Sequence, residues 1–178
     1  MSGSAGLNTG SRSVYASGVR RPARIFLVAL VVACATGASA GERPLPPTRT
    51  RALLEWLRAG TYRTWVAEPA VHPSVPAHGN NVRTWLSPTL VEDLQAGRTT
   101  FRRGAAMVKE LYFAGEEQVI GYSVMRKVRG RSGRRGKGWY FFETFDGRTP
   151  IVRPGRGAKV CVGCHQDGND YYLSGFLP

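Results

Sequence analysis

Three stretches rich in Val, Ile, Tyr, Phe and Trp stand out in the second half of the 178-residue chain. They span residues 105–113, 119–128 and 139–145, and each has about the length of a β-strand. Gly-containing segments separate them, and residues 114–117 are suited to a hairpin turn. The pattern predicts antiparallel strands joined by turns, with an exposed loop rich in Arg and Gly at residues 129–138.

The first half of the chain predicts two short helices. In residues 50–59 leucines recur at helical spacing, and Gly60 follows as a terminator. For the second helix, Ser87 is suited to cap the amino end, Pro88 fits the first position and Gly97 ends it. Both helices therefore precede the predicted strands.

The segment between the two helices, residues 68–81, carries three prolines and is expected to form a loop. Helices followed by a run of strands, without an internal repeat, are typical of an α+β fold. We therefore expect a mainly antiparallel β-sheet with two or more short helices.

The amino-terminal 40 residues have the three parts of a secretory signal. Residues 1–24 hold four Arg and no acid, and residues 25–33 form an apolar run too short to span a membrane. The small-residue sequence Ala38-Ser39-Ala40 fits a cleavage site. We therefore expect a signal peptide over residues 1–40 and a periplasmic or secreted protein.

Lipidation is the alternative to this cleavage. Val31-Val32-Ala33-Cys34 resembles a bacterial lipoprotein cleavage box, although Leu is absent from the third position before the cysteine. If that box is used, Cys34 anchors the protein to a membrane. In either case we expect a Pro-rich linker at residues 41–49 and one domain at residues 50–178.

The chain is strongly basic, with a formal net charge of +13 that falls to +9 without residues 1–40. Many of the Arg residues lie in Gly-rich turns rather than along a helix face, which argues against a nucleic-acid-binding protein. An acidic redox partner protein or an anionic membrane surface fits the charge better.

The sequence Cys161-Val162-Gly163-Cys164-His165 has the pattern of covalent haem attachment. Two thiols can bond the two vinyl groups, and the histidine that follows can bind the iron. After cleavage at Ala40 both remaining cysteines belong to this motif. The sequence therefore predicts one covalently bound haem c, with Cys161 and Cys164 as attachment sites and His165 as the metal ligand.

Three other interpretations of this motif were weighed. A thioredoxin-like redox pair would need a preceding βαβ unit, and none is predicted. A zinc site would need a fourth ligand, for which His72 and His78 are candidates. A plain disulfide is the simplest alternative. The predicted export favours haem attachment over all three.

The sixth iron ligand is not evident in the sequence. Only 13 residues follow His165, and none of them is Met. Met107 and Met125 lie on predicted strands and are expected to pack in the core, while His72 and His78 lie in the Pro-rich loop. An iron with one open face favours small-molecule binding or catalysis over electron transfer alone.

Five stretches of the chain together resemble the cytochrome P460 and cytochrome c′-beta family. They are His78-Gly79, Val82-Arg83-Thr84, residues 104–111, Gly138-Trp139-Tyr140 and residues 161–173. The likeness covers roughly residues 50–178. It implies a mainly antiparallel β fold that encloses one haem, often in a homodimer, and that binds nitric oxide or oxidises hydroxylamine.

The resemblance also implies roles for two side chains. Lys109 matches the position at which the P460 enzymes carry a lysine bonded to the porphyrin, and Arg83 matches a distal-pocket arginine. On an extended strand Lys109 would share a mostly apolar face with Met107 and Leu111, where it needs a partner or an aqueous exit. The alternative is a lysine that reaches solvent near a sheet edge.

Three functions therefore stay open at the level of sequence. The first is a haem oxidoreductase that acts on small nitrogen compounds with Lys109 and Arg83. The P460 enzymes use a distal carboxylate for this chemistry, whereas residues 155–160 contain no acid and the motif does not assign Glu143. The second is a gas-binding haem protein, and the third is a one-electron carrier that docks an acidic partner through residues 129–137.

Overall fold

A computed structural model describes residues 44–74, 78–79, 81–151 and 153–178, all of which belong to one unit spanning residues 41–178. The signal peptide predicted for residues 1–40 and the lipidation alternative at Cys34 lie outside the described residues.

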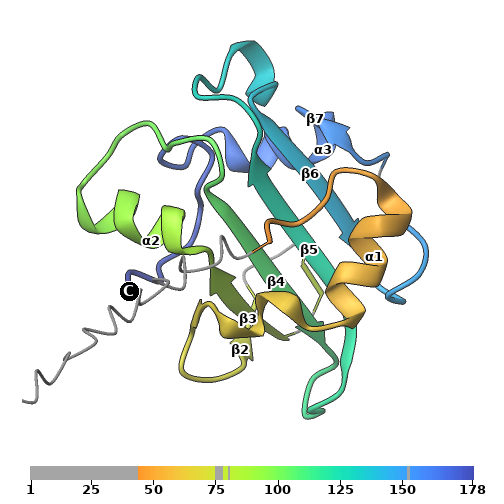
Figure 1. The fold of residues 1–178 in the computed structure, drawn as a ribbon. Helices are drawn as coiled ribbons and strands as arrows, with labels where there is room; N and C mark the ends of the chain where they lie inside the picture. The colour runs from red at the N-terminus through yellow and green to blue at the C-terminus, as the bar shows by residue number, and fades with distance from the viewer. Residues whose placement is uncertain (1–43, 75–77, 80, 152) are drawn as a thin grey trace, which may run out of the picture. The chain divides into compact units, whose positions relative to one another are not determined.

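The described chain forms an α+β fold around one mostly antiparallel sheet (Figure 1). Its strands are β1 (Val66–Ala67), β2 (His72–Pro73), β3 (Asn81–Leu86), β4 (Ala106–Tyr112), β5 (Val119–Lys127), β6 (Trp139–Thr144) and β7 (Gly155–Arg156). They follow the order β1-β3-β4-β5-β6-β7, and β2 pairs with another part of β3. The helices are α1 (Thr50–Arg58), α2 (Pro88–Gln95) and α3 (Lys159–His165), with 3-10 turns η1 (Thr61–Thr64) and η2 (Arg134–Gly136). The predicted fold class is confirmed.

The three strands expected from the apolar stretches are confirmed as β4, β5 and β6, each within one or two residues at its ends. Residues 114–117 form the expected turn, in which the carbonyl of Phe113 accepts a hydrogen bond from the amide of Glu116 at 3.2 Å. Gly115 has a φ of +79°, which favours glycine. Strong local patterns thus located the centre of the sheet.

The prediction of a continuous loop over residues 68–81 is wrong at two places. His72 and Pro73 form the short strand β2, which pairs with the beginning of β3, and Asn81 is already the first residue of β3. Pro73 is tolerated because β2 lies at the margin of the sheet and needs no full ladder of amide donors.

The two predicted helices are confirmed as α1 and α2. Helix α1 ends at Arg58, and its buried leucines face the sheet. Helix α2 begins at Pro88, and the side-chain oxygen of Ser87 accepts a hydrogen bond from the amide of Leu90 at 3.3 Å. This is the expected amino-terminal cap.

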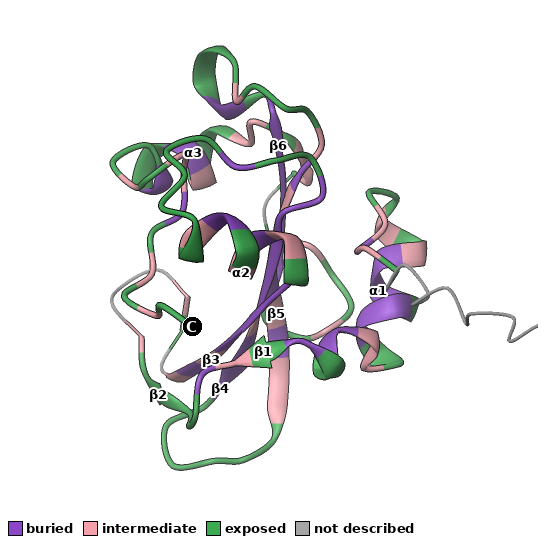
Figure 2. Ribbon diagram, turned by 60° about the vertical axis from the view of Figure 1, so that its left-hand side comes forward, coloured by how far each residue is buried: buried purple, intermediate pink, exposed green. Residues whose placement is uncertain are grey.

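The sheet separates two apolar clusters, because alternate residues of each strand point to opposite faces. Figure 2 shows α1 on one side of the sheet and α2 and α3 on the other. The cluster on the α1 side includes Leu53, Leu57, Tyr62, Trp85, Val108, Val124 and Phe142. The cluster on the other side includes Leu86, Leu90, Phe101, Met107, Met125, Trp139, Phe141, Val162 and Tyr172. The carboxyl-terminal segment therefore packs on the face opposite α1.

None of the helices among the described residues is long and apolar enough to cross a membrane.

Candidate haem site

Helix α3 carries all three residues of the Cys-x-x-Cys-His motif. Cys161 and Cys164 are three positions apart and so lie on one face of the helix, and both are free thiols. His165 is the last residue of α3 and is only 5% exposed. The side chain of Val162 packs into the apolar cluster beside Met125 and Trp139 and so fixes the helix against the sheet.

The ring of His165 is oriented by the backbone that follows it. Its Nδ1 lies 2.9 Å from the carbonyl oxygen of Tyr171, and only a protonated Nδ1 can donate to that oxygen. Burial lowers the pKa of His165, while the hydrogen bond to Tyr171 acts in the opposite sense. A neutral ring with the proton on Nδ1 leaves a lone pair on Nε2 for a metal.

A cavity of about 920 Å³ opens beside α3. Its chemically active lining residues are Cys164, His165, Lys109, Glu68, His72 and His78. Apolar walls come from Val82 on β3 and from Tyr172, Leu173 and Phe176 after α3. A volume of this size is in the range of pockets that hold cofactors and small ligands.

Lys109 lies in this cavity, on the face of β4 that the alternation predicts. It pairs with Thr84 on β3 and with Ser123 on β5, so it is in the interior of the sheet and not at an edge. Burial lowers the pKa of Lys109, while the charges of Glu68 and Glu143 act to raise it. The structure therefore brings Lys109 together with Cys164 and His165.

Thr84, the neighbour of Lys109 across the strand pair, has a side chain without a protein partner. Its hydroxyl is buried and makes no hydrogen bond within the described structure, and the residue lines the same cavity. Buried hydroxyls are normally satisfied, so this unpaired group is an exception within the described residues.

Two polar groups from distant parts of the chain meet next to His165. Nδ1 of His78 lies 2.6 Å from Oε1 of Glu143, although the two residues are 65 positions apart. The ring of His78 is edge-on to the ring of His165 at a centroid distance of 5.9 Å. Phe141, two residues before Glu143 on β6, lies 6.0 Å from the same ring.

A carboxylate, Glu68, lines the large cavity. It is 7% exposed, and its Oε2 accepts a hydrogen bond from the amide of Thr84 at 2.5 Å and lies 3.0 Å from Nε2 of His72. The expectation of a loop holds for His78 but not for His72, which lies on β2, and both also reach the cavity wall.

Arg83 does not join these residues. In the register of β3 and β4 it pairs with Glu110, on the sheet face opposite Thr84 and Lys109. Its Nε donates to the carbonyl of Glu68 at 2.9 Å, and its guanidinium lies 4.9 Å from the ring of Trp85. Arg83 is thus held away from the cavity lining.

Met107 and Met125 are buried in the apolar cluster, as the core-packing prediction expects. Met125 also lines a small cavity of about 50 Å³ that includes Cys161, Phe141 and Glu143. This cavity shares His78, Cys164 and His165 with the larger one, whereas Lys109 lines only the larger one.

Cys161 does not have the lowered pKa of a redox-active thiol. Burial raises the pKa of Cys161 to about 11, and the charge of Glu143 adds to the shift. Catalytic thiols of thioredoxin-like proteins have lowered pKa values. Within the described ranges no group of three or more His, Cys, Asp and Glu side chains is arranged to hold a metal ion, so the zinc interpretation gains no support.

Sequence reasoning missed three parts of this site. It gave no role to the His78–Glu143 pair, to Glu68 or to the carbonyl of Tyr171. Nothing in the sequence links positions 65 residues apart, and a backbone carbonyl leaves no mark in a sequence. Glu143 alone carried a signal, as a charged residue within an aromatic strand.

No protein-family model and no curated protein matches the chain.

Proposed function

We propose that the chain is an exported mono-haem c-type cytochrome that binds small nitrogen compounds, such as nitric oxide and hydroxylamine, at an open iron face and oxidises hydroxylamine there. Cys161 and Cys164 hold the haem through thioether bonds, and His165 is its protein ligand. A ferric haem held there would take one electron at a time from hydroxylamine, with the released proton going to a protein base, and would pass each electron on to an external one-electron acceptor.

One observation carries the proposal: α3 presents both thiols and a histidine whose Nδ1 is held by a backbone carbonyl, beside a large cavity. A donor bond from Nδ1 to a backbone carbonyl is the common arrangement of metal-binding histidines. A thioredoxin-like pair or a plain disulfide would require neither the oriented ring of His165 nor the large cavity beside it.

The cavity itself also fits such a group. Its walls combine apolar side chains with a few polar ones, and the hydroxyl of Thr84 lacks a partner. A flat, mostly apolar macrocycle with polar edges would cover the apolar walls and leave polar groups for a small ligand.

The chain's own residues supply the remaining functions of an oxidoreductase. Lys109 orients a polar ligand with its ammonium group, next to the hydroxyl of Thr84. His78, which lines the cavity and is hydrogen-bonded to Glu143, accepts protons that hydroxylamine oxidation releases, because a hydrogen-bonded carboxylate and imidazole can share a proton. Arg83 has no role in this proposal, since it is bound to the backbone of Glu68.

The proposal is tested with the exported protein and two lysine variants. In Lys109→Met, we expect hydroxylamine oxidation to fall about tenfold or more, as for the loss of a charge-assisted hydrogen bond. Lys137→Met, which removes an exposed lysine, is the matched control and should keep its rate. The measurement is the rate of haem reduction by hydroxylamine, followed optically.

Two results would contradict this function. If the wild-type protein binds nitric oxide but hydroxylamine does not reduce it, the gas-binding alternative is correct. If Lys109→Met retains the wild-type rate and spectrum, Lys109 has no part in the reaction.

A basic surface beside α3 favours a second candidate, the one-electron carrier. No Asp or Glu occurs in residues 129–142 or 147–166. Arg129 and Arg156 line one depression, and Arg153, Arg156 and Lys159 line the next. Nε of Arg156 donates to the carbonyl of Lys137 at 2.9 Å, which joins the loop of η2 to this surface.

Charge reversal tests whether this surface guides a redox partner. In Arg134→Glu/Arg135→Glu, electron transfer to the anionic oxidant hexacyanoferrate(III) should slow about tenfold at low salt, and the difference should shrink as salt is added. Arg51→Glu, on α1 across the sheet, is the control. A cationic cobalt complex should react faster with the double variant than with the wild-type protein. If the double variant and the wild type react at equal rates with each oxidant, the surface has no guiding role.

A further inference from the structure

Two consecutive residues after the motif adopt an unusual backbone conformation. Asp170 has a φ of +47° and Tyr171 a φ of +73°, in the left-handed region that favours glycine. A strained conformation in residues with side chains persists only when surrounding contacts enforce it. Since the carbonyl of Tyr171 accepts the hydrogen bond from His165, the strain lies in the segment that orients this histidine.

The carboxylate of Asp170 provides the enforcing contacts. Its Oδ2 accepts hydrogen bonds from the amide of Phe101 at 2.8 Å and from Nζ of Lys127 at 2.5 Å. Its Oδ1 accepts from the hydroxyl of Ser132 and, at 3.5 Å, from Nε1 of Trp139. Four segments of the chain thus converge on one side chain that is 4% exposed.

Lys127 is fully buried at the end of β5, with a side chain that is 0% exposed. Besides Asp170 it contacts the hydroxyl of Ser132, and its Nζ lies 5.0 Å from the centroid of the Trp139 ring. A buried ammonium without a carboxylate is very unfavourable, so the position of Asp170 is tied to the sheet.

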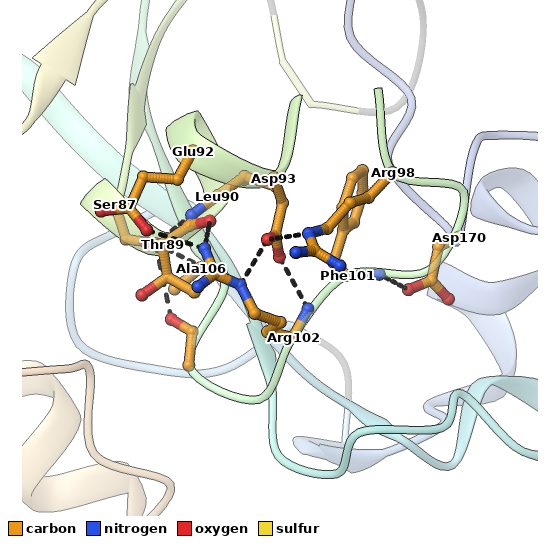
Figure 3. A network of polar contacts seen from close by, with 11 residues as sticks. Ser87, Thr89, Leu90, Glu92, Asp93, Arg98, Phe101, Arg102, Ala106 and Asp170 are labelled. Carbon is orange, nitrogen blue, oxygen red and sulfur yellow. Dashed lines mark hydrogen bonds and ion pairs between the residues drawn. The ribbon is translucent and has the colours of Figure 1, made fainter. Parts of the chain in front are cut away.

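The other end of this network is also fixed (Figure 3). The side chain of Asp93 on α2 is 0% exposed and accepts from the amide of Arg102 at 2.7 Å and from Nε of Arg98 at 3.1 Å. These bonds hold residues 98–102, and with them the amide of Phe101 that binds Asp170. Contacts from helix α2, through Phe101, and from strand β5, through Lys127, therefore both hold Asp170 in place.

We propose that the Lys127–Asp170 ion pair positions the iron ligand: by holding Asp170 and Tyr171 in the left-handed conformation, it aims the Tyr171 carbonyl at Nδ1 of His165. The inference rests on the proposed haem function, because it assigns the pair a role in tuning the iron. A histidine whose Nδ1–H is held by an acceptor donates more electron density through Nε2 and stabilises the oxidised iron.

The test uses the exported holoprotein and the variants Asp170→Asn and Lys127→Met. Asp167→Asn is the matched control, because it removes an exposed carboxylate from the same segment. Two quantities are measured on folded, haem-loaded protein: the iron–histidine stretching frequency of the ferrous form by resonance Raman spectroscopy, and the midpoint potential. The stretching frequency reports on the bond from His165 and not on the stability of the fold, whereas the potential also responds to the buried charge that a variant removes.

We expect a lower stretching frequency in both variants, a more positive potential in Asp170→Asn, and wild-type values in the control. If a variant does not fold, Ser132→Ala replaces it, since this change removes one hydrogen bond from Asp170 and leaves both charges; a smaller shift in the same direction is expected. Wild-type frequency and potential in the folded variants would overturn the proposal and leave the pair with a structural role alone.

Failure of the haem proposal would be recognised separately. If the wild-type protein carries no haem, the same variants are compared by ¹⁵N NMR of the imidazole rings. Loss of the Nδ1–H form of His165 in Asp170→Asn would support positioning, and an unchanged ring would overturn it.

Discussion

Glu110 is buried on the sheet face opposite the cavity, and four side chains bind its carboxylate. Its carboxylate is 2% exposed and accepts hydrogen bonds from Tyr62 at 2.6 Å, Tyr112 at 2.7 Å and Trp85 at 3.0 Å. Nη2 of Arg63 adds an ion pair at 2.8 Å. This residue ties η1 to β3 and β4 without touching the cavity.

The stability that Glu110 contributes should depend on pH. Burial alone would raise the pKa of Glu110, but the hydrogen bonds from Tyr62, Tyr112, Trp85 and Arg63 outweigh burial and lower the pKa below its ordinary value of 4.5. Because the pKa is lower in the folded state, this stabilisation is complete above pH 4.5 and is lost as the pH falls through the folded-state value.

Glu110→Gln should therefore reduce the free energy of unfolding at pH 7 by about 3 kcal/mol. It should also remove part of the loss of stability between pH ~5 and pH ~3. Denaturant unfolding at pH 7, pH ~5 and pH ~3 measures both the loss of stability and its dependence on pH. Glu55→Gln, at an exposed pair on α1, is the control with a change below about 1 kcal/mol; equal effects in the two variants would contradict this account of Glu110.

How much of the site the sequence predicts is clearest at the residue scale. Cys161, Cys164 and His165 form a local motif, and strand alternation places Lys109 on the cavity face of β4. Arg83 follows the same alternation to the opposite face, as its pairing with Glu110 shows. The distal-pocket role of Arg83 was inferred from the family resemblance alone. Once β3 is known, strand alternation places Arg83 and Lys109 on opposite faces of the sheet.

At the scale of elements, β5 and β6 approach each other closely at Gly121. A Cβ built at this position would lie 2.1 Å from the carbonyl oxygen of Thr144 on β6. No side-chain rotation can relieve this overlap, because the obstacle is backbone. Gly121 is therefore required by the pairing that places Glu143 beside His78.

Gly121→Ala should shift the β5–β6 pairing and lower the free energy of unfolding by about 3 kcal/mol. It should also alter the surroundings of His165, since Thr144 adjoins Glu143. Gly130→Ala, where a Cβ would have no atom within 4 Å, should cost less than about 1 kcal/mol. Thermal unfolding of both variants checks the prediction, and a small effect at Gly121 would show that the pairing is looser than described.

Elements with strong local patterns were predicted and those that depend on distant partners were not. β4, β5 and β6 have continuous β-forming sequences, whereas β1, β2 and β7 are two residues long and exist only through their pairing. β3 was missed because Arg83 and Thr84 interrupt its apolar pattern and prolines precede it.

At the scale of the whole described unit, the two faces of the sheet carry different groups of residues. The α1 face holds the aromatic cluster and Glu110, and the opposite face holds α3, Lys109 and the Lys127–Asp170 pair. Changes on the α1 face should therefore alter stability and leave the properties of the proposed haem site nearly unchanged.

The most direct test of the central claim is the mass of the denatured protein after export in a host that matures c-type cytochromes. We expect the mature chain plus one haem, and a pyridine haemochrome spectrum typical of two thioether bonds. The double variant Cys161→Ala/Cys164→Ala should give the mass of the bare chain. A wild-type chain without haem, under conditions in which a control cytochrome matures, would contradict the account.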